Sequence, residues 1–231
     1  MTTDFSTFEN RIGVAFSDKR ILELAFTHRS YVNEQKGTKG EHNERLEFLG
    51  DAVLELITTD FLYRKYPEKA EGDLTSYRAG LVNASTLATI AVGLGMNDFL
   101  LLSKGEARDT GRARQYNLAN AFEALIGAMY MDQGYDVTRD FIDAHLLPLT
   151  DDIVDKHLWR DAKSRFQELA QEADGVTPTY QTMSEVGPDH NKVFTIGVFV
   201  GDKKIAEGTG RSKQEAEQSA ADAGLDARGW K

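Results

Sequence analysis

The sequence predicts two consecutive domains of different class, an all-α domain over residues 1–155 and an α+β domain of order α-β-β-β-α over residues 160–231. Three observations support this division. Apolar residues recur at helical spacing through most of the first part, strand-like runs lie between Thr179 and Thr209, and helical spacing returns after Ser212. A chain of 231 residues has room for two modest domains.

The composition narrows the possible classes of protein and of site. The chain has 41% hydrophobic residues, enough for true cores, and no cysteine, which excludes disulfides, thiolate metal sites and a cysteine nucleophile. It has no signal-peptide pattern and no run of about 18 apolar residues, so we expect a cytoplasmic protein without a membrane partner. The net charge is −10, but 10 basic and 12 acidic residues from Arg160 onward give the second domain only −2. Composition therefore leaves binding to nucleic acid open.

The first residues predict short helices and then a loop. Helical spacing covers Phe5 to Phe16 and Lys19 to Phe26, whereas Thr27 to Glu41 is polar and contains glycine. We assign no chemistry to His28 in this loop, because a single histidine is more often a hydrogen-bonded structural residue.

The stretch from Asn43 to Leu56 predicts an amphipathic helix with an unusual acidic side. One side carries apolar residues, namely Leu46, Leu49, Val53, Leu56 and Ile57. The other side carries Glu44, Glu47, Asp51 and Glu55. Like charges at these spacings repel one another, so we expect a divalent cation such as Mg²⁺ beside them. The alternative from spacing alone is a solvated acidic face.

The next elements lead to a basic loop. The helical pattern continues to Tyr66 before Pro67, Glu68 to Asp73 predicts a turn, and Leu74 to Gly93 is helical again. Leu100 to Arg114 predicts a polar loop with three arginines and one lysine. Such a loop is usually solvated, but beside a phosphodiester substrate it could hold phosphates.

The stretch from Leu118 to Asp132 predicts a second helix with a polar pair on an otherwise apolar surface. Its apolar face carries Leu118, Ala121, Phe122, Leu125, Ile126 and Met129, and Asn120, Glu123 and Gly127 lie opposite. A polar pair in so apolar a helix is costly to bury without a partner. We therefore expect Asn120 and Glu123 to face Glu47 and Asp51 across a metal ion. A helix over Tyr135 to Leu147 and a charged connector over Asp151 to Trp159 complete this part.

The second domain begins with an amphipathic helix over Ala162 to Ala173. Three predicted strands follow, over Thr179 to Val186, Lys192 to Val200 and Lys203 to Thr209. Ser212 and Glu215 form the capping-box pattern of a last helix.

Two motifs resemble known families. The run E-R-L-E-F-L-G-D from Glu44 to Asp51 is the signature of the ribonuclease III family, and T-H-R-S before it also occurs there. G-P-D-H-N-K and R-S-K-Q-E-A-E-Q-S-A-A, in their α-β-β-β-α context, resemble the double-stranded RNA-binding domain. The resemblance covers about Phe8 to Ala227. It implies a homodimeric endoribonuclease, dependent on Mg²⁺ with Mn²⁺ as a substitute, that cleaves double-stranded RNA in rRNA precursor and other RNA processing. Its products would carry 5′-phosphates and two-nucleotide 3′ overhangs.

The resemblance also implies roles for residues of the first domain. Glu47, Asp51 and Glu123 match the catalytic residues, and together with Asn120 they match the metal ligands. Glu44 and Glu71 match acidic positions near the RNA, and Phe48 matches a residue at the dimer interface. Phe48 also lies on the acidic side of its helix, outside the apolar stripe.

The second domain would bind RNA through three patches, because A-form RNA is recognised by its shape, 2′-hydroxyls and phosphates. The first patch is on the leading helix and comprises Ser164, Gln167, Glu168 and Gln171. The others are His190 and Lys192 at the first hairpin, and Arg211 and Lys213 at the last helix. Gln214 stands where the family often has a second lysine, so we expect weak affinity.

Asn120 departs from the family pattern, which has Asp at this position. The difference leaves two explanations, natural divergence or a substitution that traps substrate, and it supports an alternative function, a protein that binds double-stranded RNA without cleaving it efficiently. A second alternative, a helical phosphohydrolase of nucleotides, is disfavoured by the RNA-binding pattern after Arg160.

Overall fold

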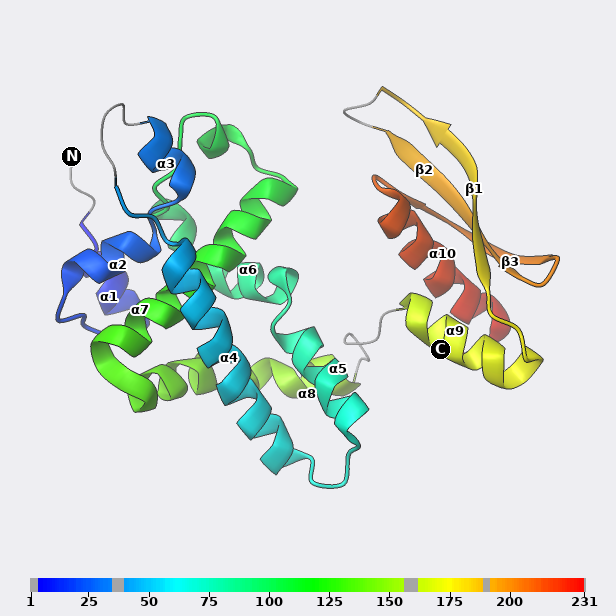
Figure 1. Cartoon of the computed structure of the whole chain (residues 1–231), viewed down its shortest axis with the longest axis horizontal. Helices are drawn as coiled ribbons and strands as arrows, with labels where there is room; N and C mark the ends of the chain where they lie inside the picture. The colour runs from blue at the N-terminus through cyan, green and yellow to red at the C-terminus, as the bar shows by residue number, and fades with distance from the viewer. Residues whose placement is uncertain (1–3, 35–39, 156–161, 189–191, 231) are drawn as a thin grey trace. The chain divides into compact units, whose positions relative to one another are not determined.

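The computed structural model describes residues 4–34, 40–155, 162–188 and 192–230. The backbone divides into two compact units, Met1–Trp159 and Arg160–Lys231. The first unit is helical and the second packs helices against an antiparallel sheet (Figure 1). The predicted fold class, all-α followed by α-β-β-β-α, is therefore confirmed. No helix in the described ranges is long and apolar enough to cross a membrane.

The first unit contains helices of very different length. They are α1 (Ser6–Ile12), α2 (Lys19–Ala25), α3 (Arg29–Glu34), α4 (Glu44–Lys65), α5 (Glu71–Leu81), α6 (Ala84–Gly93), α7 (Arg112–His145) and α8 (Thr150–Asp155), with short 3-10 turns η1 (Met96–Asp98), η2 (Glu106–Arg108) and η3 (Leu147–Leu149).

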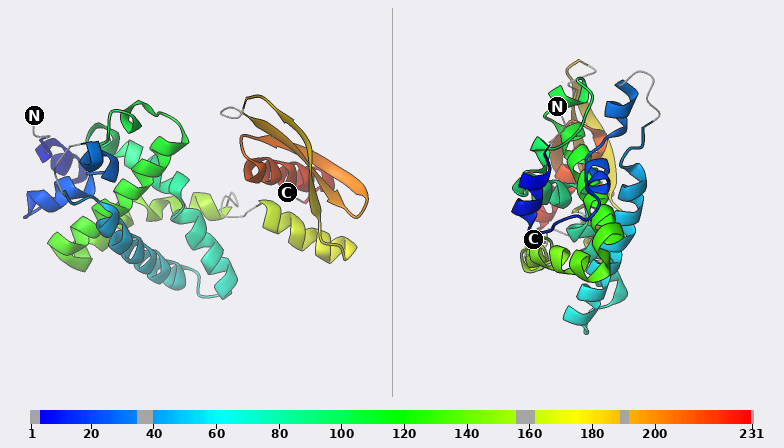
Figure 2. Two further views of the ribbon diagram at one scale, coloured as in Figure 1. Left: turned by 45° about the horizontal axis from the view of Figure 1, so that its top comes forward. Right: turned by 90° about the vertical axis from the view of Figure 1, so that its left-hand side faces the viewer.

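Helix α7 forms the centre of this unit. Phe122, Leu125 and Ile126 are fully buried on it, and α2, α4 and α6 all pack against it. Figure 2 shows α4 and α7 packed against each other in two further views. Burial continues almost all round α7 between Leu118 and Met129, as expected for a helix with neighbours on several sides.

The backbone of α7 is interrupted at Gly134. This residue has φ of 81°, a left-handed conformation that a residue with a side chain rarely adopts. The two helices predicted over Leu118 to Asp132 and Tyr135 to Leu147 therefore follow each other directly, with one glycine as the bend between them.

Several local predictions in this unit were wrong. The predicted loop from Thr27 to Glu41 contains α3, and the first helix ends at Ile12 rather than Phe16. The turn predicted over Glu68 to Asp73 ends early, because α5 begins at Glu71. The single helix predicted over Leu74 to Gly93 is two helices, since the Asn83 side chain caps α6 by accepting a hydrogen bond from the Thr86 N–H. The predicted connector begins as α8, whose Ile153 is buried. The basic loop contains η2 and ends in the first turn of α7.

The second unit packs two helices against a sheet. Its elements are α9 (Ala162–Asp174), β1 (Thr179–Val186), β2 (Val193–Val200), β3 (Lys203–Gly210) and α10 (Lys213–Arg228). The strands are antiparallel in the order β1-β2-β3. Phe166 of α9, Ile196 and Val198 of β2 and Leu225 of α10 form the core. The Ser212 side chain caps α10 by accepting a hydrogen bond from the Glu215 N–H, as predicted.

Candidate active site and RNA interface

Helices α4 and α7 cross at two glycines, and this crossing positions the candidate active site. A Cβ atom added to Gly50 would lie 1.7 Å from the backbone oxygen of Glu123, and one added to Gly127 would lie 2.1 Å from that of Leu46. No side chain fits at either position, so the two backbones approach more closely than side chains would allow. Residues one turn from these glycines on each helix are therefore brought together.

The close approach brings three carboxylates into electrostatic contact, and we call Glu47, Asp51 and Glu123 the carboxylate cluster. Burial raises the pKa of Glu123 to about 7, and the negative charges of Asp51 and Glu47 add to this. Burial also raises the pKa of Glu47, with further contributions from Glu44 and Asp51. Glu47, Glu123 and Asn120 are partly buried, and Asp51 is exposed. The site therefore disfavours additional negative charge and favours a cation or a proton.

The donor atoms of this site suit a hard divalent cation. Carboxylate and amide oxygens are the ligands that Mg²⁺ prefers. Among the described residues, however, no three histidine, aspartate or glutamate side chains are arranged so that they could hold a metal ion as they stand. The mutual repulsion that raises the pKa of Glu123 opposes a tighter arrangement, and Asn120 contributes an oxygen without charge. The residues fit a cation in chemistry, and binding one requires their side chains to move closer together.

A second polar layer lies one turn before the carboxylate cluster on both helices. On α4, Glu44 lies 3.3 Å from the Arg29 guanidinium and 3.8 Å from His42 Nδ1. On α7, Asn117 donates a hydrogen bond of 3.1 Å to the Glu106 carboxylate. Arg29, Glu106 and Asn117 were not among the predicted site residues. The spacing Asn117, Asn120, Glu123 was the available signal, because it extends one polar edge along the helix.

His28 connects the segment before α3 to the basic loop. Its Nδ1 lies 2.8 Å from Ser30 Oγ, which accepts a hydrogen bond from the Ser103 N–H at 3.1 Å. Burial lowers the pKa of His28, which favours the neutral ring. These contacts are those of a structural histidine.

The basic loop uses part of its charge internally. The Arg114 guanidinium donates to the backbone oxygens of Asp109 and Ala107, and Arg112 lies over the ring of Tyr116. Arg114 therefore shapes the loop, and Lys104 and Arg108 are its remaining cationic side chains.

Glu71 lies apart from the carboxylate cluster. It occupies the first turn of α5 and lines a cavity of about 420 Å³ against the second half of α4. Lys69 and Arg78 line the same cavity, and the Glu71 carboxylate accepts a hydrogen bond from Thr75 Oγ1 at 2.9 Å. The positive side chains make this cavity more suitable for an anion than the carboxylate cluster is.

An exposed apolar stripe follows α4 beside its acidic edge. Phe48 is 81% exposed, Leu56 58% and Tyr63 71%. The prediction that Leu56 faces the core was wrong. The buried face of α4 is centred on Gly50 and Leu54, because α7 packs against that side. Leu56 therefore lies on the exposed side of α4 with Phe48.

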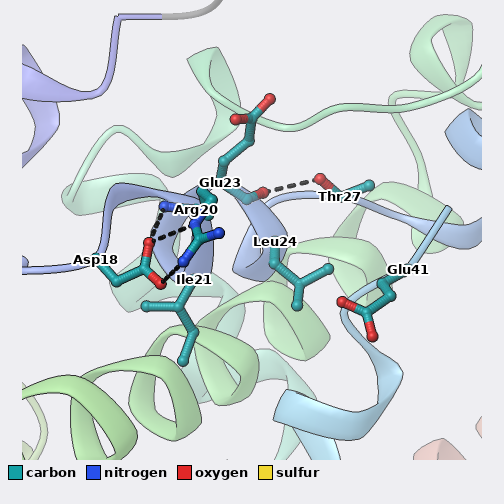
Figure 3. Close-up of a pocket in the computed structure, with 7 residues that line it drawn as sticks. All are labelled: Asp18, Arg20, Ile21, Glu23, Leu24, Thr27 and Glu41. Atoms are coloured by element: carbon teal, nitrogen blue, oxygen red, sulfur yellow. Dashed lines mark hydrogen bonds and ion pairs between the residues drawn. The ribbon is translucent and has the colours of Figure 1, made fainter.

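The cavity in Figure 3 lies elsewhere, beside α2. It measures about 490 Å³ and is lined by Asp18, Arg20, Ile21, Glu23, Leu24, Thr27 and Glu41, none of which is a predicted site residue. Asp18 accepts hydrogen bonds from the backbone and the guanidinium of Arg20, so the charges of Asp18 and Arg20 are already paired. None of the residues of the carboxylate cluster lines this cavity.

The second unit presents the predicted RNA-binding residues on its surface. The side chains of Ser164, Gln167, Glu168 and Gln171 are exposed on α9. Arg211 precedes α10 and Lys213 is its first residue. Lys192 and Lys213 both lie near Glu185 of β1, at 3.7 and 3.3 Å. His190 lies outside the described residues.

Comparisons with known proteins agree with these observations. A family model described as ribonuclease-III-like matches residues 18–149, and the double-stranded RNA binding motif matches residues 162–227. Ribonuclease 3 of Pelotomaculum thermopropionicum is 47% identical over 213 residues, which cover 92% of this chain and 88% of that protein. Ribonuclease 3 of Bacillus licheniformis is 45% identical over 221 residues, covering 96% of this chain and 88% of that protein.

A solved structure extends the agreement to three dimensions. The nuclease domain of ribonuclease III from Campylobacter jejuni has a TM-score of 0.56 and 37% identity, and the match covers 64% of this chain and 97% of that one. That domain shows structural flexibility in a region involved in dimer formation. The chain belongs to the ribonuclease III family of endoribonucleases and carries a double-stranded RNA-binding domain.

Proposed function

We propose that this protein is a Mg²⁺-dependent endoribonuclease that cleaves both strands of double-stranded RNA in rRNA precursors and other structured RNAs. Its products carry 5′-phosphates and two-nucleotide 3′ overhangs. The observation that carries the proposal is the glycine crossing of α4 and α7. Burial there raises the pKa of Glu123 to about 7, and the charges of the nearby Asp51 and Glu47 add to this rise. The nuclease domain spans residues 1–155 and the RNA-binding domain residues 160–231.

Glu47, Asp51, Glu123 and Asn120 would hold the metal ion, directly or through water. A bound Mg²⁺ supplies an activated water and neutralises charge on the scissile phosphate. Mn²⁺ is expected to substitute, because it binds similar oxygen ligands. With a pKa of about 7, Glu123 is protonated in roughly half of the molecules at neutral pH, and a cation would compete with that proton.

Asn120 offers an amide oxygen at the fourth position of this site. It carries no formal charge and does not accept a proton, so it orients a ligand without adding to the negative charge. The charge balance of the site then depends on Glu47, Asp51 and Glu123.

Two copies of the chain form the working enzyme, because each monomer contains one carboxylate cluster and a duplex has two strands. The exposed stripe of Phe48, Leu56 and Tyr63 supports this proposal, since large apolar side chains exposed along one side of a helix are typical of an interface. Phe48 is the expected anchor.

Double-stranded RNA is bound mainly by the second domain. Ser164, Gln167, Glu168 and Gln171 meet 2′-hydroxyls, His190 and Lys192 contact the next groove, and Arg211 and Lys213 contact phosphates across the intervening one. In the first domain, Glu44 with its partner Arg29 contacts RNA one turn from the carboxylate cluster. Glu71 and Lys69 contact RNA farther along α4, at the cavity that they line.

A second candidate function is supported by Asn120 and by the absence, in the described part of the chain, of three side chains that could hold a metal as they stand. In this case the protein binds double-stranded RNA and cleaves it poorly.

A cleavage assay distinguishes these two functions. A long, fully paired RNA duplex is incubated with the protein in Mg²⁺, in Mn²⁺ and in EDTA, and the ends of the products are sequenced. The proposal expects short duplexes with two-nucleotide 3′ overhangs and 5′-phosphates in both metals and none in EDTA. Tight binding with no cleavage in either metal would support the binding protein, and cleavage that continues in EDTA would refute the metal-dependent mechanism.

A further inference from the structure

In the RNA-binding domain, Glu185 lies between two lysines that the proposed function assigns to RNA. Its Oε1 is 3.3 Å from Lys213 Nζ, and its Oε2 is 3.7 Å from Lys192 Nζ. The two lysines belong to different patches, since Lys192 precedes β2 at the first hairpin and Lys213 begins α10. One carboxylate therefore neutralises charge in two patches.

The position of Glu185 is one that a phosphate would also favour. Glu185 pairs across the sheet with Phe194, so the two side chains share one face. Phe194 packs against the core formed with α9 and α10, and Lys213 Nζ lies 5.8 Å from the centre of its ring. The Glu185 carboxylate therefore lies on the helix side of the sheet, near the first turn of α10, where the helix dipole favours an anion.

Arg211 provides a contrast within the same patch. In the described ranges its guanidinium has no carboxylate within ion-pair distance, and its backbone N–H donates to Glu215 at 2.9 Å. Among the described residues, Arg211 therefore has no carboxylate to release before it meets a phosphate, whereas Lys192 and Lys213 must exchange Glu185 for RNA.

We propose that Glu185 is an intramolecular competitor of RNA phosphates, occupying Lys192 and Lys213 in the free protein and lowering the affinity for duplex RNA. The inference rests on the proposed RNA-binding role of these lysines. An exposed ion pair contributes little to holding a lysine in place, whereas a carboxylate a few ångströms from a bound phosphate repels it directly. Competition therefore outweighs any benefit of preorganisation.

The test compares the full-length wild-type chain with Glu185→Gln, which has nearly the same size and no charge. The matched control is Glu207→Gln, which removes the carboxylate from another Glu–Lys ion pair of the same domain. Glu207 lies 2.6 Å from Lys204 on β3. Binding of a fluorescent 20-base-pair RNA duplex is measured by anisotropy in EDTA, over a series of KCl concentrations.

Glu185→Gln is expected to bind about threefold more tightly or better at low salt. Its log Kd should also depend more steeply on log salt, by about 1, because one more phosphate contact is made at the expense of counterions. Glu207→Gln should stay within about twofold of wild type. Weaker binding by Glu185→Gln would show that Glu185 positions the lysines. An effect equal to that of Glu207→Gln would show a general effect of charge. Either result would overturn the proposal that Glu185 competes with RNA phosphates. A wild-type chain that does not bind the duplex would instead refute the proposed RNA-binding function.

Discussion

By the resemblance described above, Asn120 departs from the family pattern in the nuclease domain, and its partly buried position on α7 one turn before Glu123 makes this residue chemically important. Asn and Asp have nearly the same size, so the packing of α7 does not depend on which is present. Their charges differ, and a hard cation favours a carboxylate over an amide. The effect of this residue should therefore appear in metal dependence rather than in stability.

Replacing Asn120 by Asp is expected to raise the single-turnover cleavage rate at limiting Mg²⁺ by one to a few powers of ten, each about 1.4 kcal/mol of barrier. RNA binding should change little, because it rests mainly on the second domain. The measurement is cleavage of one RNA hairpin by both proteins across a Mg²⁺ titration. Equal rates at every Mg²⁺ concentration would show that this position needs no charge.

Glu123 provides a second prediction, because its pKa is raised to about 7 in the folded chain from an ordinary value near 4.5. The folded state then binds this proton more tightly than the unfolded state, so the associated stability is present at low pH. It is lost as the pH rises from about 4.5 through about 7. The full shift corresponds to about 3 kcal/mol, and solvent screening of a partly exposed carboxyl reduces it to about 1–2 kcal/mol.

In EDTA, Glu123→Gln should match the unfolding free energy of the wild type near pH 4.5 and exceed it by about 1–2 kcal/mol at pH 8. Urea unfolding at a series of pH values measures the difference between the two proteins. A difference that does not change with pH would show that Glu123 does not titrate near neutrality.

Among the elements, the α4–α7 pair determines the geometry of the active site. A Cβ at position 50 would overlap the backbone of Glu123, so the helices must separate to accept it. Gly50→Ala is expected to lower the unfolding free energy by about 3 kcal/mol and to reduce cleavage further, because the carboxylate cluster is pulled apart. Gly93→Ala on α6 is the control, since an added Cβ there meets nothing within 4 Å. If both variants unfold at the same urea concentration, close contact at the crossing is not required.

The strands and the cap of α10 could be predicted because local pattern determines them. The run from Thr179 to Val186 contains several β-branched and aromatic residues, which favour strands, and β1 has these bounds. The side of α4 that faces the core could not be predicted in the same way. Leu56 fits the apolar stripe of the sequence, but the close approach of α7 at Gly50 turns Leu56 outward. That contact joins residues far apart in the chain, so the helical spacing of apolar residues within α4 does not predict it.

The candidate site was predictable to a similar extent. Spacing within each helix indicates the acidic edge of Glu47 and Asp51 and the polar pair of Asn120 and Glu123, and their proximity depends on the crossing. Glu185 illustrates the limit, since nothing about it in the sequence indicates that its carboxylate meets lysines before β2 and at the start of α10.

For the whole molecule, the central question is how two strands of RNA are cut. Phe48 is 81% exposed, and an apolar anchor at the centre of an interface carries much of its energy. Phe48→Glu is therefore expected to convert a dimer into a monomer at micromolar concentration, as measured by sedimentation. Val92→Glu on α6 is the control, because Val92 is also exposed and lies outside the stripe on α4. A monomeric wild-type chain would contradict the proposed homodimer.

The most direct test of the account is single-turnover cleavage of one RNA duplex by the wild type, by Glu123→Gln and by Asp140→Asn. Asp140 lies on the same helix beyond the bend at Gly134 and pairs with Arg139, so its substitution controls for loss of a carboxylate from α7. We expect Glu123→Gln to lower the rate at saturating RNA at least about 100-fold, roughly 2.7 kcal/mol of barrier, with duplex affinity unchanged. Asp140→Asn should cleave like the wild type. Undiminished cleavage by Glu123→Gln would contradict the claim that the α4–α7 crossing assembles the active site.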